Sequence, residues 1–169
     1  MLLFLDFLEK KKEVVAHFDR YKRVLDTLDR YYPGKNEVHA LYADLYLKTQ
    51  RFKEASEHLK ILAFSEDSKY IYWDQLLSIY SFLNKFPDMF RLGQKAIKEF
   101  EKQPRLYLLT GIGAMQTNKA DTAVPILKKG LQYVQNKKST RVQFYIQLGE
   151  AYHRLKNFPQ SDHYFNQAL

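Results

Sequence analysis

Few residues in this 169-residue chain have the type and spacing that chemistry requires. There is no cysteine, which excludes disulfides, thiol catalysis, cysteine–zinc sites and iron–sulfur clusters. Glu54 and His58 are four residues apart and can meet on one helix face, but without a third ligand they are interpreted as a solvated pair. His39 occupies a core-type position and is interpreted as a packed histidine. The five histidines lack metal-site spacing; they are His17, His39, His58, His153 and His163.

Gly111 and Gly113 share the spacing of a dinucleotide-binding loop, but the third glycine is missing and no predicted strand precedes them. We therefore expect both glycines at helix–helix contacts. No carboxylate pair stands out as a general acid and base, and no serine lies in a Gly-x-Ser-x-Gly context. We expect no enzymatic activity, no metal and no cofactor, so catalysis would require a domain outside this stretch.

The net charge of +8 is unevenly distributed, because residues 104–141 hold seven basic residues against one acid, Asp121. Such a cluster can bind the phosphates of a nucleic acid or an acidic protein, or it can be a solvated face. Aromatic residues are not interleaved with these lysines, so a nucleic-acid partner is the less favoured interpretation. The candidate basic patch comprises Lys128, Lys129, Lys137, Lys138 and Arg141.

The elements that position these residues follow from an internal repeat. Tyr46, Tyr80 and Tyr152 hold the same place in three similar segments, each with a phenylalanine six residues later. One unit begins at position 36 and the next at position 70, and the same interval leads on to position 104. The last unit begins near position 142, so the unit before it is four residues longer than the earlier ones. The extra residues fall in the polar stretch 135–140.

This pattern resembles the tetratricopeptide repeat, a helical hairpin of about 34 residues with small and aromatic residues at fixed positions. The last unit matches at Tyr145, Leu148, Gly149, Tyr152, Ser161, Phe165 and Ala168. The resemblance implies an all-α, right-handed superhelical solenoid of antiparallel helical hairpins. It forms a single array over residues 1–169, with units at 2–35 (degenerate), 36–69, 70–103, 104–141 and 142–169 (truncated). The unit at 70 departs from the pattern at Leu77 and Gly93, and the unit at 104 departs at Ala114.

Helix-breaking residues agree with this phase. Pro104 is expected to open a first helix, and Pro87 and Pro159 to lie in the first turn of second helices. Asn84 and Asn157 precede those turns as candidate caps, and Pro125 falls inside a predicted helix. In the first unit, Glu9 and Lys12 interrupt the pattern, which leaves open whether that unit is a hairpin or one continuous helix. A clean helical stripe begins at Val14.

The resemblance also implies a concave groove lined by the first helices. Candidate groove residues are Asp44, Asp74, Ser78, Leu108, Ile112, Met115, Glu150 and His153, and other groove positions hold Phe82, Arg105, Ile146 and Arg154. Leu108, Ile112 and Met115 form an apolar strip that either anchors a partner or packs against neighbouring helices. The acidic groups argue against a clamp for carboxyl-terminal tails.

We therefore expect a protein–protein interaction scaffold that binds a peptide or helix in the groove. The alternatives are a nucleic-acid-binding helical repeat that uses the basic 104–141 face, or a regulatory module of a larger multidomain protein.

The chain stops at Leu169 within a predicted second helix and without a polar capping helix, which suggests an excerpt of a longer array. The exposed end could then pair with a second copy as a homodimer. No apolar run reaches the roughly 18–20 residues of a membrane span. A soluble protein is expected, with the cytoplasmic and periplasmic compartments both left open, and Lys-, Tyr- and Asn-rich usage hints at a bacterial source.

Overall fold

The computed structural model describes residues 13–135 and 137–169, and every regular element in them is an α-helix. The helices are α2 (Phe18–Tyr31), α3 (Asn36–Lys48), α4 (Phe52–Ala63), α5 (Tyr70–Phe82), α6 (Phe86–Glu99), α7 (Pro104–Gln116), α8 (Ala120–Gln132), α9 (Lys138–Arg154) and α10 (Phe158–Ala168). The expectation of an all-α fold is confirmed. The chain divides into two compact units, Met1–Tyr72 and Trp73–Leu169, with the boundary inside α5. In the described ranges, none of the helices is long and apolar enough to cross a membrane.

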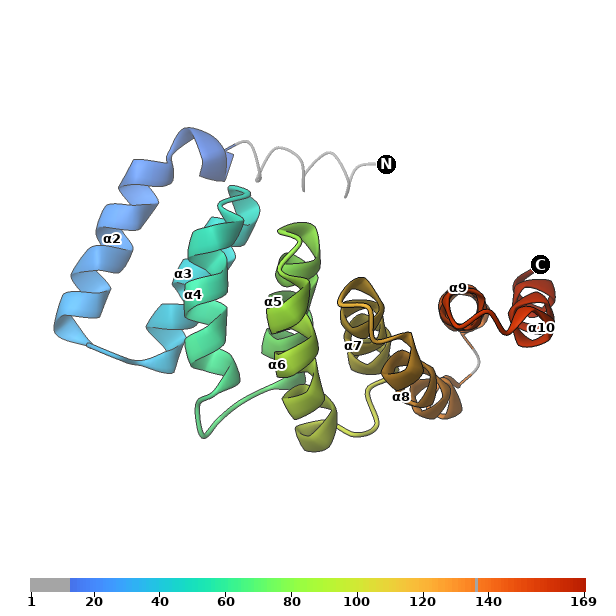
Figure 1. Cartoon of the computed structure of the whole chain (residues 1–169). Helices are drawn as coiled ribbons and strands as arrows, with labels where there is room; N and C mark the ends of the chain where they lie inside the picture. Colours follow the sequence, from blue (N-terminus) through green and yellow to red (C-terminus); the bar gives the residue numbers. More distant parts are fainter. Residues whose placement is uncertain (1–12, 136) are drawn as a thin grey trace. The chain divides into compact units, whose positions relative to one another are not determined.

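One turn recurs between the helices of successive hairpins. Its left-handed residue is Gln50, Asn84, Asn118 and Lys156 in turn, with φ between 55° and 59°. The first three stand at equal intervals along the chain, and the last interval is longer, as the extended repeat unit 104–141 requires. The next backbone N–H donates to the carbonyl five residues earlier, as from Arg51 to Tyr46 at 2.8 Å, which is a Schellman helix end. This turn reverses the chain, and α3 pairs with α4, α7 with α8 and α9 with α10 (Figure 1).

The prolines stand where the repeat phase predicts them. Pro104 opens α7, Pro87 and Pro159 are the second residues of α6 and α10, and Pro125 lies inside α8. At these helix starts the missing proline N–H would have had no helical acceptor, so it costs nothing.

Only one of the two predicted asparagine caps is confirmed. The Asn157 side chain accepts a hydrogen bond from the Gln160 backbone N–H at 3.3 Å and caps α10. Asn84 is wrong as a cap, because it supplies the left-handed residue of its turn and Lys85 takes the N-cap position. One residue cannot do both, since an N-cap residue needs a negative φ.

From here on, the first unit is the compact unit Met1–Tyr72 and the second unit is Trp73–Leu169. In the first unit, α2 packs on α3, and α3 packs on α4. The stripe predicted from Val14 is interrupted by a turn at His17, and α2 begins at Phe18 with Leu25 as its one buried residue. Side chains of α3 and α4 supply most of the core: Val38, Tyr42, Leu45, Leu59 and Leu62. The interruption predicted at Glu9 and Lys12, and with it the nature of the first helix of unit 2–35, lies outside the described residues.

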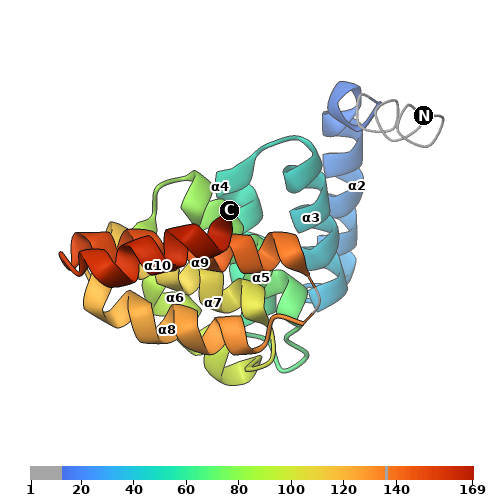
Figure 2. The same ribbon diagram turned by 90° about the vertical axis from the view of Figure 1, so that its right-hand side faces the viewer.

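The second unit has a continuous apolar core around α7, in which Tyr107, Leu127 and Phe144 are fully buried. The predicted role of the two central glycines is confirmed, since a Cβ on Gly111 would overlap the Leu127 side chain, and one on Gly113 would press on the backbone of Phe90. Close approach of α7 to α8 and to α6 therefore requires glycine at both places. Helix α9 lies beside α7 and α8 and pairs with α10 (Figure 2).

Two departures from the repeat pattern are explained by this packing. A Cβ on Gly93 would overlap the buried Thr110 side chain, so the threonine takes the space that a ring usually fills at this position. Leu77 replaces a small residue and is itself completely buried.

Candidate functional site

The first helices of the second unit are joined by two arginines, the first of which is Arg105. From the start of α7 its Nε donates to Asp74 Oδ1 at 2.6 Å, and its Nη2 donates to Ser78 Oγ at 3.2 Å. The Asp74 side chain is only 14% exposed. Burial raises the pKa of Asp74, while the Arg105 charge and hydrogen bond act in the opposite direction. Arg105, itself at a predicted groove position, thus links two candidate groove residues, Asp74 and Ser78.

Arg154 makes the corresponding link from α9 to α7. Its Nη1 donates to the Met115 carbonyl at 2.8 Å, and its Nη2 donates to Glu150 Oε1 at 2.6 Å. The Met115 carbonyl is in the last turn of α7, at the negative end of the helix dipole, and besides Arg154 it accepts from the Asn118 N–H at 3.1 Å. The repeat pattern puts both arginines on the groove side, but it does not reveal that each one fastens a first helix to its neighbour.

We call the surface formed by α5 from Trp73 onward, α7 and α9 the first-helix face. Its predicted apolar strip is largely core, because Leu108 is 6% exposed and Met115 is fully buried. Only Ile112 is half-buried, and it packs against the same core cluster. The interpretation of Leu108 and Met115 as partner anchors is therefore corrected to the packing alternative. The physical reason is that α7 contacts α6, α8 and α9, and nine of its thirteen residues are buried.

Exposed apolar groups occur on the flanking first helices instead. Phe82, the last residue of α5, is 67% exposed, and Ile146 of α9 is 42% exposed. His153 lies on the last turn of α9, exposed, with its ring edge-on to Phe158 at 5.5 Å between centroids. The face therefore alternates apolar side chains with ion pairs.

Asp44, the remaining candidate groove residue, belongs to the first unit. It lies on α3 and forms an exposed ion pair with Lys48 at 2.6 Å. Exposed pairs of this kind contribute little to stability, about 0.3–0.5 kcal/mol on a helix.

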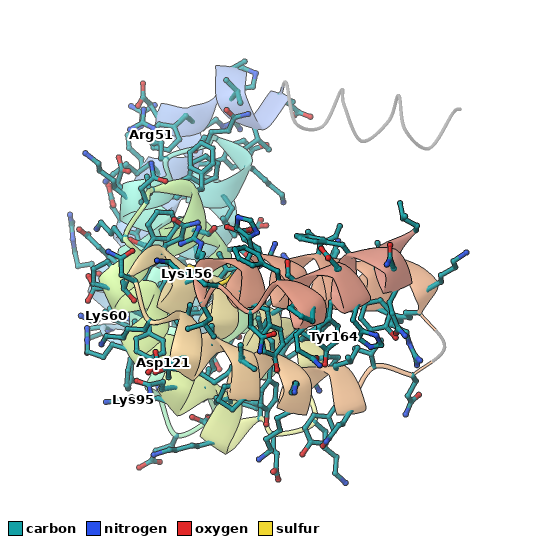
Figure 3. All side chains as sticks on the ribbon, turned by 45° about the vertical axis from the view of Figure 1, so that its right-hand side comes forward. Arg51, Lys60, Lys95, Asp121, Lys156 and Tyr164 are labelled. Atoms are coloured by element: carbon teal, nitrogen blue, oxygen red, sulfur yellow. The ribbon has the colours of Figure 1, made fainter. Side chains whose placement is uncertain are left out.

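Three members of the predicted basic patch engage different neighbours within the chain. Lys128 Nζ lies 5.4 Å from the centre of the Tyr152 ring, and interactions with Tyr152 and Tyr164 raise the pKa of Lys128. Tyr164 is labelled in Figure 3 on the side of α10 that faces α8. The next residue, Lys129, pairs with Glu101 at 2.7 Å.

The rest of the patch lies around the start of α9. Arg141 Nη2 donates to the Val134 carbonyl at 3.1 Å, and Lys137 and Lys138 are exposed. The expectation that aromatics are not interleaved with these lysines fails at Lys128, because Tyr152 and Tyr164 stack at 5.7 Å beside it. These rings engage the lysine within the chain, so they do not form an open stacking platform for bases.

Two of the three histidines of the first unit form a pair that was not predicted from the sequence. His39 Nδ1 and His58 Nδ1 are 3.0 Å apart, and the His58 ring stacks on Tyr42 at 4.6 Å. Burial and the neighbouring His39 lower the pKa of His58. The predicted Glu54–His58 pair is replaced by this His–His contact. Among residues 13–135 and 137–169, no three His, Asp or Glu side chains gather to hold a metal.

Comparisons with known proteins bear on the fold. No protein-family model matches the chain, and no curated protein sequence does. One crystal structure of MamA matches with a TM-score of 0.77 at 19% identity, covering 99% of this chain and 89% of that chain. Another gives 0.75 at 19%, covering 94% and 90%. BtubC (BKLC) from P. vanneervenii gives 0.72 at 20%, covering 96% and 74%. At these identities the likeness shows the fold, which is an all-α helical-repeat solenoid.

Proposed function

We propose that the chain is a protein-interaction scaffold that binds an extended peptide or a helix along the first-helix face. The observation that carries this proposal is the exposure of Phe82 and Ile146 on a face otherwise built from buried side chains and ion pairs. Apolar anchors surrounded by oriented polar groups are typical of peptide-recognition surfaces.

The repeat resemblance supports the same proposal. In tetratricopeptide repeats the first helices line the binding groove, and a turn that recurs at Gln50, Asn84, Asn118 and Lys156 is what such an array requires. We propose that the units at 36–69, 70–103, 104–141 and 142–169 are repeats of one array, preceded by the degenerate unit 2–35. The fold shared with MamA is compatible with a scaffold and needs no catalytic centre.

The chemistry of the face indicates what the partner carries. A guanidinium has five N–H donors, and the Arg105 side chain remains 50% exposed while it bonds Asp74 and Ser78. Arg154 remains 34% exposed. Both guanidinium groups can donate further hydrogen bonds to a carboxylate or a backbone carbonyl of a partner while they keep their hydrogen bonds within the chain. We therefore propose a partner segment with apolar side chains next to acidic groups or free carbonyls.

Affinity capture from lysate tests this proposal, with wild type and Ile146→Asp as baits and Gln132→Asp on α8 as the matched charge control. Ile146 is the better target than Ile112, because an aspartate at half-buried Ile112 would also damage the core. We expect a partner held by wild type and Gln132→Asp to lose about tenfold or more in affinity with Ile146→Asp, since an apolar anchor is replaced by a charge. Equal capture by all three baits, with unchanged circular dichroism and melting, would exclude the first-helix face.

A further inference from the structure

A cavity of about 530 Å³ lies away from that face, between the second helices α6 and α8. Ile97 and Lys98 of α6 line one wall, and Pro125, Ile126 and Lys129 of α8 line the other. Tyr107 of α7 and Glu101, just after α6, complete it. This size and a mostly apolar lining with a few polar groups are typical of ligand sites.

The Tyr107 hydroxyl is the unusual feature of this cavity. The residue is 1% exposed, and its hydroxyl has no hydrogen-bond partner in the part of the chain that the structure describes. Burial is the main cause that raises the pKa of Tyr107, and the neighbouring Tyr133 raises it further. Tyr133 does not make a hydrogen bond of ordinary geometry to the Tyr107 hydroxyl. A buried donor that bonds to nothing is rare and costs the folded state its full desolvation penalty.

An exchangeable ion pair lies beside this hydroxyl. Lys129 Nζ is 2.7 Å from Glu101 Oε1, and both side chains are about half exposed. A pair so exposed to water is worth little and can change partners at small cost. An incoming carboxylate can take Lys129 from Glu101, with Lys98 as a second cation on the rim. The Tyr107 hydroxyl is covered in the present arrangement, and it can donate to the carboxylate once the Lys129–Glu101 pair has opened.

We propose that this cavity is a second binding site, for a short peptide in which one glutamate or aspartate is flanked by apolar side chains. Its lining of two lysines and one glutamate has a net charge that suits one carboxylate and disfavours the double charge of phosphate. Ile97, Ile126 and Pro125 offer apolar surface for the neighbouring side chains. The walls are short and open to water, which suits a peptide better than a long acyl chain.

Amide NMR of the ¹⁵N-labelled full chain tests the proposal, with N-acetyl-Leu-Glu-Leu-amide as the probe and N-acetyl-Leu-Gln-Leu-amide as its uncharged match. We expect saturable shifts at residues 97–101 and 125–133, and about tenfold weaker binding of the glutamine peptide, because it loses the charge-assisted bond to Lys129. Equal binding of both peptides, or shifts confined to α5, α7 and α9, would overturn the proposal. So would tighter binding of inorganic phosphate or decanoate at the same amides.

Two variants separate binding from folding. Lys129→Gln should bind the glutamate peptide about fivefold more weakly. Tyr107→Phe should bind it about threefold more weakly while its melting temperature stays the same or rises, because it removes an unpaired buried hydroxyl. Wild-type affinity in both variants would refute the site. The outcome is independent of the first-helix face, since Ile146→Asp should leave the affinity for this peptide unchanged.

Discussion

The two units share a turn but hold their helices together by different means. In the first unit, polar and aromatic pairs join the helices beside the apolar core: His39 meets His58, and Tyr42 donates to Asp26 at 2.7 Å across α2 and α3. The Cζ atom of Arg51, which is labelled in Figure 3, lies 3.8 Å from the centre of the Phe18 ring. In the second unit the contacts depend on glycine, with side chains of neighbouring helices seated directly on the α-carbons of Gly111 and Gly130.

The difference teaches that helices of one repeat geometry can meet through paired polar and aromatic side chains or through close contacts at glycine. A glycine contact responds to volume and not to pH, whereas an imidazole pair responds to protons. The first unit should therefore be sensitive to protonation and the second to added volume. In a repeat array, where contacts are made between neighbours, such sensitivities are expected to be local.

The largest expected effect is that of Gly130→Ala in the second unit. The new Cβ would overlap Tyr107 Cβ and lie 2.8 Å from Phe144 Cε1, and neither atom is the free end of a flexible side chain. Overpacking of this kind costs about 1–3 kcal/mol, and here we expect about 3 kcal/mol before roughly 1 kcal/mol of helix propensity is regained. Hydrogen exchange should show lost protection in α7–α9 with α3–α4 unchanged, and Gln132→Ala on the exposed side of α8 serves as control. Uniform loss in both units would break the comparison.

Acidification should give the opposite result, with the loss of hydrogen-exchange protection confined to the first unit. The pKa of His58 is lowered by burial and by His39, with Glu57 and Asp29 acting the other way. The unfolded chain then binds more protons than the folded one, so the His58 contribution is complete above the ordinary histidine pKa of about 6.5 and is lost as pH falls below it. Two cations this close at a surface repel by about 1–2 kcal/mol.

Exchange protection of α3 and α4, corrected for intrinsic rates, should therefore fall between pH 7.5 and pH 5.5, while that of α7 and α8 should not. His39→Gln keeps a hydrogen-bonding side chain without the second charge, and should reduce the fall. An equal fall in His39→Gln would show that the imidazole pair is not its cause.

Deleting one tyrosine hydroxyl in each unit tests the same difference, with expected changes in the free energy of unfolding of about 1 kcal/mol. Tyr42→Phe removes the hydrogen bond to Asp26, a carboxylate whose pKa is lowered by Lys22 and by this hydroxyl, and should cost about 1 kcal/mol. Tyr107→Phe removes a hydroxyl that has no hydrogen-bond partner among residues 13–135 and 137–169, and should leave the stability unchanged or raise it by up to about 1 kcal/mol. Urea unfolding followed by NMR at both units measures each change where it occurs, and the same sign for both would contradict the assignment.

Much of the fold could be predicted from the sequence, because its determinants are local or periodic. The helices, the positions of Pro104 and Pro125, and the packing role of Gly111 all follow from spacing within one unit. Burial of Leu108 and Met115 could not be predicted in this way. A helical stripe shows that residues share a face, but not whether neighbouring helices cover that face.

The candidate sites depended on relations between units that the period does not contain. Arg105 meets Asp74 across 31 residues only because α7 lies beside α5 at one offset along their axes. Lys128 and Lys129 are adjacent in sequence but about 100° apart around the helix, so one faces Tyr152 and the other Glu101. A signal for the His39–His58 pair does exist, since both residues stand at positions where the first and second helices of one unit meet.

The smallest effect concerns the turn that both units share. Gln50 and Lys156 adopt a left-handed backbone, with φ of 59° and 58°, that costs residues with a Cβ about 1–2 kcal/mol and costs glycine nothing. Part of the gain is lost to the greater entropy of glycine in the unfolded chain, so Gln50→Gly and Lys156→Gly should each stabilise by only about 0.5 kcal/mol. Asn118→Gly is the control and should change little, because asparagine tolerates this conformation. Equal gains in local exchange protection would mean that the units differ in their helix contacts and not in their turns. A gain in one unit alone would mean that the contacts of that unit also strain its turn.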